Sequence, residues 1–158
     1  EIGSGLVGSE MCIRDSTYDE LEKWFDRFQS KAEDKMLVFL QAGGEKFIEV
    51  ARRSGSYKDQ TGNLRSSIGY IIAKDGEVVT ENFKEGDKGT DKTTGKYKGR
   101  RLAEEVSLSY TGGYVLVGVA GMEYAAAVEA KGYEVVSGAN TQCEKYLRDT
   151  LKSIFNKI

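Results

Sequence analysis

The spacing of apolar residues changes once along this chain, and that change constrains the fold more than any other feature of the sequence. Up to about residue 53, aromatic and aliphatic residues recur every three or four positions, which is typical of an amphipathic helix. From about Ser66 the apolar residues form short runs separated by glycines, which is typical of β-hairpins. A second helical period closes the chain. We therefore expect an α+β domain in which a long N-terminal helix and a C-terminal helix pack against an antiparallel sheet of about four strands.

The N-terminal helical period carries an aromatic stripe, which we interpret as core or subunit packing rather than as a ligand site. The stripe consists of Tyr18, Leu21, Trp24, Phe25, Phe28, Ala32, Met36, Phe39 and Leu40. Gly43-Gly44 then predicts a kink or a break between two helices. The period resumes over residues 47–51 and ends at Arg52-Arg53, where cations suit the helix dipole.

Two hairpins are expected after this helix. The first pairs Ile68–Ala73 with Glu77–Thr80 through an Asp-Gly turn, a dipeptide that accepts positive φ angles. The second pairs Val106–Tyr110 with Tyr114–Val119, because apolar residues alternate with polar ones in its first half. Together the two hairpins supply the four strands of the expected sheet.

The last quarter of the chain returns to helical spacing. We expect a short helix near Glu123–Ala130, an extended piece at Tyr133–Val136, and a closing helix that begins at Thr141. Thr141 and Glu144 have the spacing of a capping box. The apolar line of the closing helix is Cys143, Leu147, Leu151, Ile154 and Ile158.

Residues 1–16 lack a helical or strand period, so we separate them from the domain. They resemble the translated read-through of sequencing adapters at the ends of metagenomic reading frames, and a disordered native tail is the alternative. Residues 17–158 are then expected to form a single domain, since a chain of this length can bury one core.

The composition excludes several classes of function. The net charge is −2, and the three acids and one base of residues 1–16 leave 22 acids and 22 bases in the remainder. Such a balance gives no electrostatic footprint for bulk nucleic-acid binding. There is no His, so neither a His-activated nucleophile nor an imidazole metal ligand can form. We expect no enzyme activity, no catalytic or metal site and no cofactor.

The two cysteines and the hydropathy pattern add further exclusions. Cys143 is the only Cys outside residues 1–16, so an internal disulfide or a thiolate metal site is not expected in the domain. No apolar stretch is long enough for a membrane span, and we expect no membrane partner.

Residues 84–101, between the two hairpins, are expected to form a long flexible loop. The segment holds seven bases, three acids and four glycines. It is compatible with a solvated mobile loop, with an arm that orders on a neighbouring subunit or partner protein, or with a phosphate-backbone contact. Deletion of 86–99 is expected to leave a folded subunit that assembles poorly. The candidate assembly residues are Lys92, Lys96, Tyr97, Lys98, Arg100 and Arg101.

A first motif, residues 61–70, joins the N-terminal helix to the first strand. Its structural residues are Thr61, Gly62, Asn63, Leu64 and Arg65. Thr61 or Asn63 is expected to cap a helical turn, and Leu64 is expected to be an apolar anchor together with Ile68.

A second motif, residues 121–133, surrounds the expected short helix. Tyr124 and Val128 are four residues apart and would share one helical face, and Gly132 suits a left-handed C-terminal cap. Glu129 is a candidate for an ion pair with Arg65, which would join the two motifs. Two separately solvated charges are the alternative.

The pairing of Thr-Gly-Asn-Leu-Arg-Ser-Ser-Ile at 61–68 with Met-Glu-Tyr-Ala-Ala-x-Val-Glu-x-Lys-Gly at 122–132 resembles the tail-completion, or head–tail joining, proteins of long-tailed phages. The group is typified by the gene-product-ten protein of an HK-type lambdoid phage. The likeness covers about residues 18–158, and the basic segment at 84–101 has no counterpart in the pattern.

The resemblance implies a structural virion protein with an α+β fold and no catalytic residues. It implies a neck component that assembles as a ring with other phage neck and tail proteins, located in the virion and in the host cytoplasm during assembly. DNA would pass through the ring without sequence-specific binding. The alternative is a small nucleic-acid- or protein-binding module that uses the basic segment 84–101.

Overall fold

The computed structural model of the protein describes residues 2–55 and 57–156, and for residues 2–17, Ser54 and Phe155 it describes the backbone alone. The chain divides into two units, Glu1–Val38 and Phe39–Ile158, which are described separately below. The interpretation of residues 1–16 as an adapter-derived or disordered tail stays a prediction.

The N-terminal helix α1 runs from Ile2 to Ser54 without interruption, so the predicted break at Gly43-Gly44 is wrong. Both glycines are buried and serve as contact points instead. A Cβ on Gly43 would lie 2.6 Å from the side chain of Leu147, and a Cβ on Gly44 would lie 2.6 Å from the ring of Tyr70. The pair therefore allows two other elements to approach the helix backbone closely. The predicted end of the helix after Arg53 is confirmed.

The sheet has three strands, β1 (Ile68–Lys74), β2 (Glu77–Asn82) and β3 (Tyr114–Ala120), in the order β2-β1-β3 with both pairs antiparallel. The first predicted hairpin is confirmed. Its turn has the expected positive φ angles, 53° at Asp75 and 89° at Gly76. The prediction of about four strands is wrong because residues 106–110 form a helix end and the turn after it instead of a strand.

Helix α3 (Thr93–Ser107) takes up half of the expected flexible loop and the first two residues of the expected strand Val106–Tyr110, whose other residues form the turn after the helix. Its buried face is a stripe of small residues at a spacing of four: Gly95, Gly99, Ala103 and Ser107. The alternation of Val106, Leu108 and Tyr110, which predicted a strand, belongs to side chains that stay exposed. Burial of the small-residue stripe therefore favours a helix more than the alternation of these exposed side chains favours a strand.

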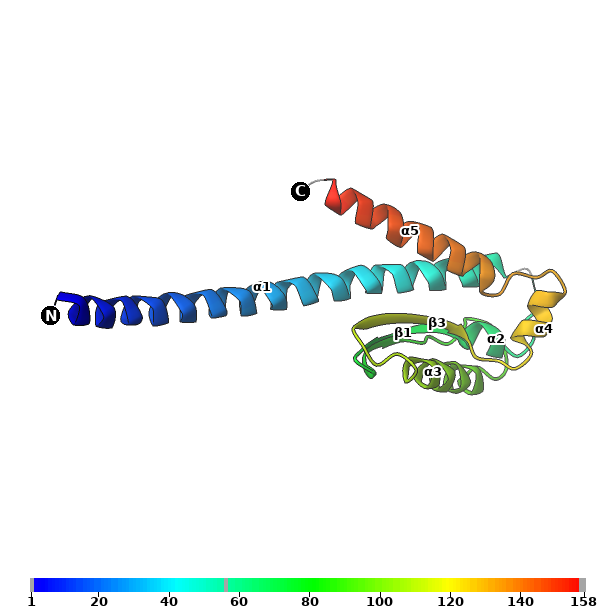
Figure 1. Cartoon of the computed structure of the whole chain (residues 1–158). Helices are drawn as coiled ribbons and strands as arrows, with labels where there is room; N and C mark the ends of the chain where they lie inside the picture. Colours follow the sequence, from blue (N-terminus) through cyan, green and yellow to red (C-terminus); the bar gives the residue numbers. More distant parts are fainter. Residues whose placement is uncertain (1, 56, 157–158) are drawn as a thin grey trace. The chain divides into compact units, whose positions relative to one another are not determined.

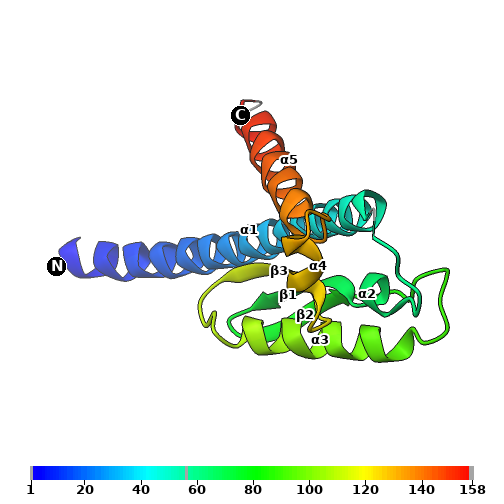
Figure 2. The ribbon, with the colours of Figure 1, turned by 90° about the vertical axis from the view of Figure 1, so that its right-hand side faces the viewer.

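The strands lie between two helical layers, α3 on one face and the C-terminal part of α1 on the other (Figures 1 and 2). On the α3 side, Ala103 packs in a cluster with Ile71, Phe83, Val117 and Val119. Because both faces are covered, the apolar run of the central strand β1 is buried along nearly its whole length. The edge strand β2 is mostly exposed.

Two further helices complete the C-terminal unit. The short helix α4 (Ala125–Ala130) is confirmed, and Gly132 after it has the expected positive φ of 88°. Helix α5 (Ser137–Phe155) begins four residues earlier than expected, so Thr141 is inside it and donates its hydroxyl to the Ser137 carbonyl at 3.1 Å. The predicted capping box is therefore wrong. The extended piece at Tyr133–Val136 is not part of the sheet.

Helix α5 packs against α1 through the first two residues of its predicted apolar line, whereas Leu151 and Ile154 are exposed and Ile158 lies outside the described residues. The Cys143 thiol donates to the Gly43 carbonyl at 3.2 Å, and the Leu147 side chain lies against Gly43. Burial raises the pKa of the Cys143 thiol, which keeps it protonated and unreactive. Cys143 is thus a packing residue.

The aromatic stripe of α1 divides into two parts with different roles. Phe39 and Leu40, at its C-terminal end, are half-buried, and Phe47 and Val50 of the resumed period beyond it belong to the core. Within the N-terminal unit, Tyr18, Trp24 and Phe28 are 57–69% exposed, so the core alternative is wrong for that part of the stripe. Among the described residues, no helix combines the length and the apolar character needed to cross a bilayer.

Candidate functional site

The two motifs, which were predicted to be joined to one another, lie side by side in the fold. Leu64 of the first motif and Ala125 of the second pack with Tyr57 and Val135 in one apolar cluster, which we name the motif junction. The Gly121 N–H also donates to the Ser67 carbonyl at 3.2 Å. Leu64 is 1% exposed, so its predicted role as an apolar anchor is confirmed.

The first motif forms the single helical turn α2 (Asn63–Ser66), and Asp59 holds its N-terminus. The Asp59 carboxylate accepts the backbone N–H groups of Gly62 at 3.1 Å and Arg65 at 2.9 Å, with a longer contact of 3.4 Å from Leu64. The predicted cap from Thr61 is present in part, because Thr61 Oγ1 accepts the Asn63 N–H at 3.3 Å, whereas Asn63 does not cap the turn and Asp59 was not predicted. The signal was present, since an Asp three residues before Gly is typical of a side-chain-to-backbone turn.

Asn63 joins the first motif to α3 instead of capping α2. Its Oδ1 accepts the Gly95 N–H at 2.7 Å and its Nδ2 donates to Asp91 at 3.3 Å. This hydrogen bond, with two from Thr94, lowers the pKa of the Asp91 carboxyl. Because Asn63 is only 7% exposed, the loss of its amide would leave buried backbone groups without a partner.

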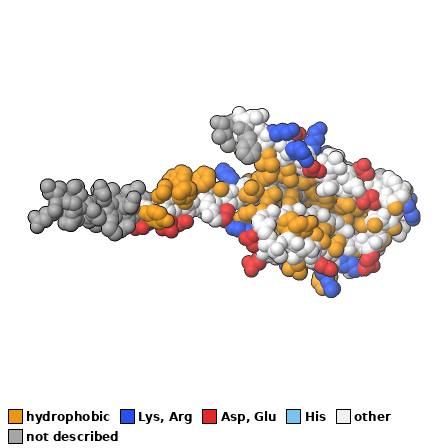
Figure 3. Space-filling view, viewed as in Figure 1, with side chains coloured by type: hydrophobic (Ala, Val, Ile, Leu, Met, Phe, Trp, Pro, Cys, Tyr) orange, Lys and Arg blue, Asp and Glu red, His pale blue; other side chains and the backbone are white. Residues whose placement is uncertain are grey.

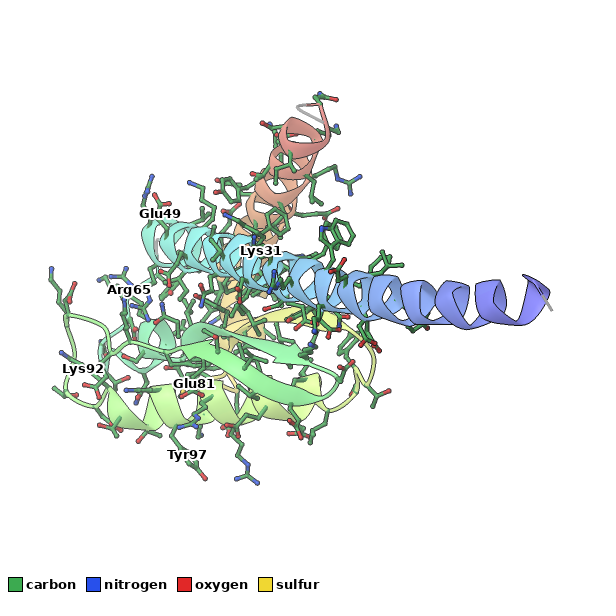
Figure 4. All side chains as sticks on the ribbon, turned by 90° about the vertical axis from the view of Figure 1, so that its left-hand side faces the viewer. Lys31, Glu49, Arg65, Glu81, Lys92 and Tyr97 are labelled. Carbon is green, nitrogen blue, oxygen red and sulfur yellow. The ribbon has the colours of Figure 1, made fainter. Side chains whose placement is uncertain are left out.

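The predicted ion pair between Arg65 and Glu129 is absent from the part of the chain that the structure describes. Arg65 donates to the Gly55 carbonyl at 3.0 Å and lies 5.6 Å from the centre of the Tyr57 ring, near the end of α1 (Figure 4). Both charges have partners within their own part of the chain, so the two motifs meet through apolar packing and backbone hydrogen bonds.

Glu129 instead caps the start of α5. Its carboxylate accepts the N–H groups of Val136 at 3.2 Å and Ser137 at 2.8 Å. Burial alone would raise the pKa of Glu129, but these hydrogen bonds outweigh it and lower the pKa. The side chain therefore fixes the connection between α4 and α5.

A depression of about 400 Å³ opens at the motif junction. Tyr124 and Val128, predicted to share one helical face, both line it, with Thr61 and Leu64 opposite. Burial raises the pKa of Tyr124, and a hydrogen bond to Thr61 partly offsets that rise.

A second depression, of about 360 Å³, lies between the end of α1 and the segment after β2. Three cations and three carboxylates line it, so it has no net preference for an anion or a cation. Arg52 joins two segments there, because its guanidinium donates to the carbonyls of Ile68 at 3.1 Å and Lys84 at 2.6 Å. The charged residues of the lining are Arg52, Asp59, Arg65, Glu85, Asp87 and Lys88.

The basic segment 84–101 is only partly a loop, and its cations do not form one surface. Residues 84–92 are irregular but bonded to the first motif: the Gly86 N–H donates to Ser66 Oγ at 2.9 Å, and the Asp91 N–H donates to the Thr61 carbonyl at 3.0 Å. Residues 93–101 form the first part of α3. The prediction of a flexible loop over the whole segment is therefore wrong.

Acidic side chains neutralise several of the candidate assembly residues. Lys98 pairs with Glu123 at 2.9 Å, and Arg100 lies 2.9 Å from Glu81. The Lys92 ammonium donates to the Asp87 carbonyl at 3.1 Å. The exposed side chains that point outward from α3 include Lys96, Tyr97 and Arg101, and Figure 4 shows Tyr97 directed away from the sheet.

A group of exposed apolar side chains lies on α1, beside the N-terminal atoms drawn in grey (Figure 3). We name it the aromatic ridge, formed by Tyr18, Leu21, Trp24, Phe25 and Phe28. Trp24 stacks on Phe28 with ring centres 5.5 Å apart and meets Phe25 edge-on at 5.3 Å. The described residues contain no group of three Cys, Asp or Glu side chains placed to hold a metal ion.

A scan of protein-family models, a search of curated proteins and a search of solved structures each find no match to this chain.

Proposed function

We propose that this protein is a structural component of a tailed-phage virion, a tail-completion or head–tail joining subunit that assembles as a ring in the neck. The observation that carries the proposal is the motif junction. The two sequence motifs on which the resemblance rests are 54 or more positions apart, yet Leu64 and Ala125 pack in one cluster. Packing between the two motifs fixes how the segments that carry them are arranged, which is a structural role.

The polar residues of both motifs support a structural role. Asn63 and Glu129 accept hydrogen bonds from backbone N–H groups of neighbouring segments, and Asp59, just before the first motif, does the same for the motif itself. Side chains that hold backbone in this way position surfaces for contact with other subunits, and a subunit of a ring needs two such surfaces. The subunit would act in the virion neck and assemble in the host cytoplasm, with other neck and tail proteins as its partners.

Negative-stain electron microscopy combined with light scattering tests the proposal on the full chain. Closed rings of uniform diameter, with a mass that is a whole multiple of 17.4 kDa, are the expected result. A monomer that binds duplex DNA, with an affinity that falls steeply between low and high salt, would favour the binding-module alternative.

The DNA titration is repeated with a variant that removes two exposed cations of the basic segment 84–101. In Lys96→Glu/Arg101→Glu both changes lie on the exposed side of α3, so the fold is expected to be preserved. If the protein is a neck subunit, the wild type is expected to form rings and to show no specific affinity for DNA that this variant could remove.

A further inference from the structure

The aromatic ridge of α1 is the strongest unassigned feature of the molecule. Tyr18 is 69% exposed, Trp24 57% and Phe28 60%, and these residues lie on a helix that continues without a break into the folded unit. Monomeric proteins rarely leave contiguous aromatic surface of this kind uncovered. We therefore expect a partner surface to cover the aromatic ridge when the protein is functional.

The spacing of the ridge specifies a helix as its partner. Tyr18, Leu21, Phe25, Phe28 and Ala32 follow one another at steps of three, four, three and four, which is the a/d pattern of a two-helix seam. Lys35 takes the next position of the pattern, so the apolar seam ends at Ala32. A second helix with the same spacing fits this seam, and the same segment of another copy is such a helix.

The size of the ridge is compatible with pairing between two copies. An aromatic side chain buries about 150–250 Å² when covered, so half-exposed side chains of the ridge offer roughly 500 Å² per copy. Two copies would bury about 1,000 Å², which is the lower limit for a specific interface. The stacked Trp24 and Phe28 rings supply the rigid aromatic anchors that carry most of the energy in such contacts.

The charges beside the seam favour antiparallel pairing. Residues 18–28 contain four acids and two bases, whereas residues 29–38 contain two of each. A parallel pair would set the two acidic halves side by side. An antiparallel pair of the seam 18–32 instead sets residues 18–28 against the partner's residues 22–32, which contain two acids and three bases, and this lowers the repulsion.

We infer that the aromatic ridge is a subunit interface at which α1 of one copy pairs, antiparallel, with α1 of a second copy. The inference rests on the proposed function in one premise, namely that copies of this chain assemble. It adds a two-fold contact that joins pairs of copies, which is distinct from the head-to-tail contacts that close a ring.

Trp24 is the only tryptophan of the chain and lies in the ridge, so it reports directly on the interface. The experiment follows full-chain protein from about 1 to 200 µM, a range that covers weak and moderate dimers. Sedimentation velocity gives the mass, and acrylamide quenching gives the access of solvent to Trp24. The expected result is a rise in mass with a parallel blue shift and loss of quenching.

The variants Phe25→Glu and Phe28→Glu place a charge in the seam and leave Trp24 in place. They are expected to weaken association at least tenfold and to keep Trp24 open to the quencher at every concentration. The matched control is Ser30→Glu, which adds the same charge to an exposed position outside the seam and is expected to associate within twofold of wild type. Far-UV circular dichroism checks that all three variants keep their helix content.

Three results would overturn the inference. The first is a Phe28→Glu variant that associates like wild type. The second is a wild type that stays monomeric, whether Trp24 is open to the quencher or covered within its own chain. The third is a blue shift that needs lipid vesicles and leaves the mass unchanged, which would assign the ridge to a membrane surface.

The same experiment separates the inference from the proposed function. Rings that persist under the microscope in Phe28→Glu would leave the neck role intact and remove the ridge from the interface. Wild-type dimers that depend on the ridge but never form rings would leave the interface intact and count against the neck role.

Discussion

Gly95 shows how one missing side chain sets the distance between two segments. A Cβ at this position would lie 2.1 Å from the Asn63 carbonyl oxygen, and a Cβ at Gly99 would lie 2.3 Å from the Ser67 carbonyl oxygen. Both contacts are with backbone, which cannot rotate away as a side chain can. The glycines thus allow α3 to lie directly on the first motif.

Gly95→Ala is therefore expected to destabilise the protein, although the same change in an ordinary helix interior stabilises it by about 1 kcal/mol. The overlap with Asn63 should cost about 1–3 kcal/mol net of that gain, as overpacking in cores does. Urea unfolding followed by circular dichroism measures the change. Lys96→Ala, one residue along on the exposed side, is the control and should change the free energy of unfolding by less than about 0.5 kcal/mol.

Asn63 is the polar counterpart of this contact. Asn63→Ala leaves the buried Gly95 N–H without its acceptor, and we expect a loss of about 1–3 kcal/mol in the free energy of unfolding. The exposed Gln60→Ala serves as the comparison in the same urea titration and should be near neutral. Equal effects of the two substitutions would contradict the role assigned to the Asn63 amide.

For Arg65 and Glu129 we predict that the two side chains contribute independently to the free energy of unfolding. Since the two side chains share no partner, Arg65→Ala and Glu129→Ala should add within about 0.5 kcal/mol in a double-mutant cycle. A coupling of more than 1 kcal/mol would show that they do interact in solution.

At the scale of elements, the connection from α4 to α5 depends on one carboxylate. Because the folded pKa of Glu129 lies below the value in the unfolded chain, its contribution is full above the unfolded pKa, about 4.3, and is lost as the pH falls through the folded pKa. Glu129→Gln should therefore be less stable than wild type by about 1 kcal/mol at pH 7. The difference should shrink below about pH 4.

Urea titrations at pH 7 and pH 3 measure this difference. Glu105→Gln removes an exposed acid from α3 and provides the control, for which no such change with pH is expected. A Glu129→Gln deficit of the same size at both pH values would mean that the hydrogen bonds, and not the charge, account for the stabilisation.

Elements with a strong local signal could be predicted from the sequence, and elements decided by packing could not. The Asp-Gly dipeptide predicted the β1–β2 turn because positive φ angles are a local property of Asp75 and Gly76. Helix α3 was missed because four glycines and many charges in residues 84–101 suggest a loop. Gly95 and Gly99 are poor helix formers that are favourable here only because β1 and α2 lie against them.

The candidate site divides in the same way. The association of the two motifs was predicted, but its chemistry was assigned to an ion pair, since opposite charges are the most visible sequence signal. Pairing of Arg65 with Gly55 and of Glu129 with Ser137 depends on where two loops run, which no local pattern encodes. The expected outcome of deleting 86–99 changes accordingly, because that deletion removes Gly95 and Gly99 and should unfold the C-terminal unit.

At the scale of the whole molecule, the two units should be separable. Residues 39–158 retain Phe47, Val50 and the whole sheet, so a fragment that begins at Phe39 should unfold cooperatively, within about 5 °C of the full chain. It lacks the ridge and should stay monomeric at concentrations at which the full chain associates. Thermal melts and sedimentation velocity of the fragment measure both, and the loss of a cooperative transition would contradict the separation.

The adjacent glycines of α1 have a consequence for how this chain can vary in length. Gly43 and Gly44 seat Leu147 of α5 and Tyr70 of β1 on directions about 100° apart around one helix. A single residue inserted between Gly44 and Phe47 would turn both contacts by about 100° relative to Phe47, which packs against Gly118 of β3, so this stretch should tolerate no insertion or deletion. Before Phe39, whole heptads could be gained or lost while the seam keeps its face. Among natural relatives, length differences in α1 are therefore expected on its N-terminal side and in steps of seven.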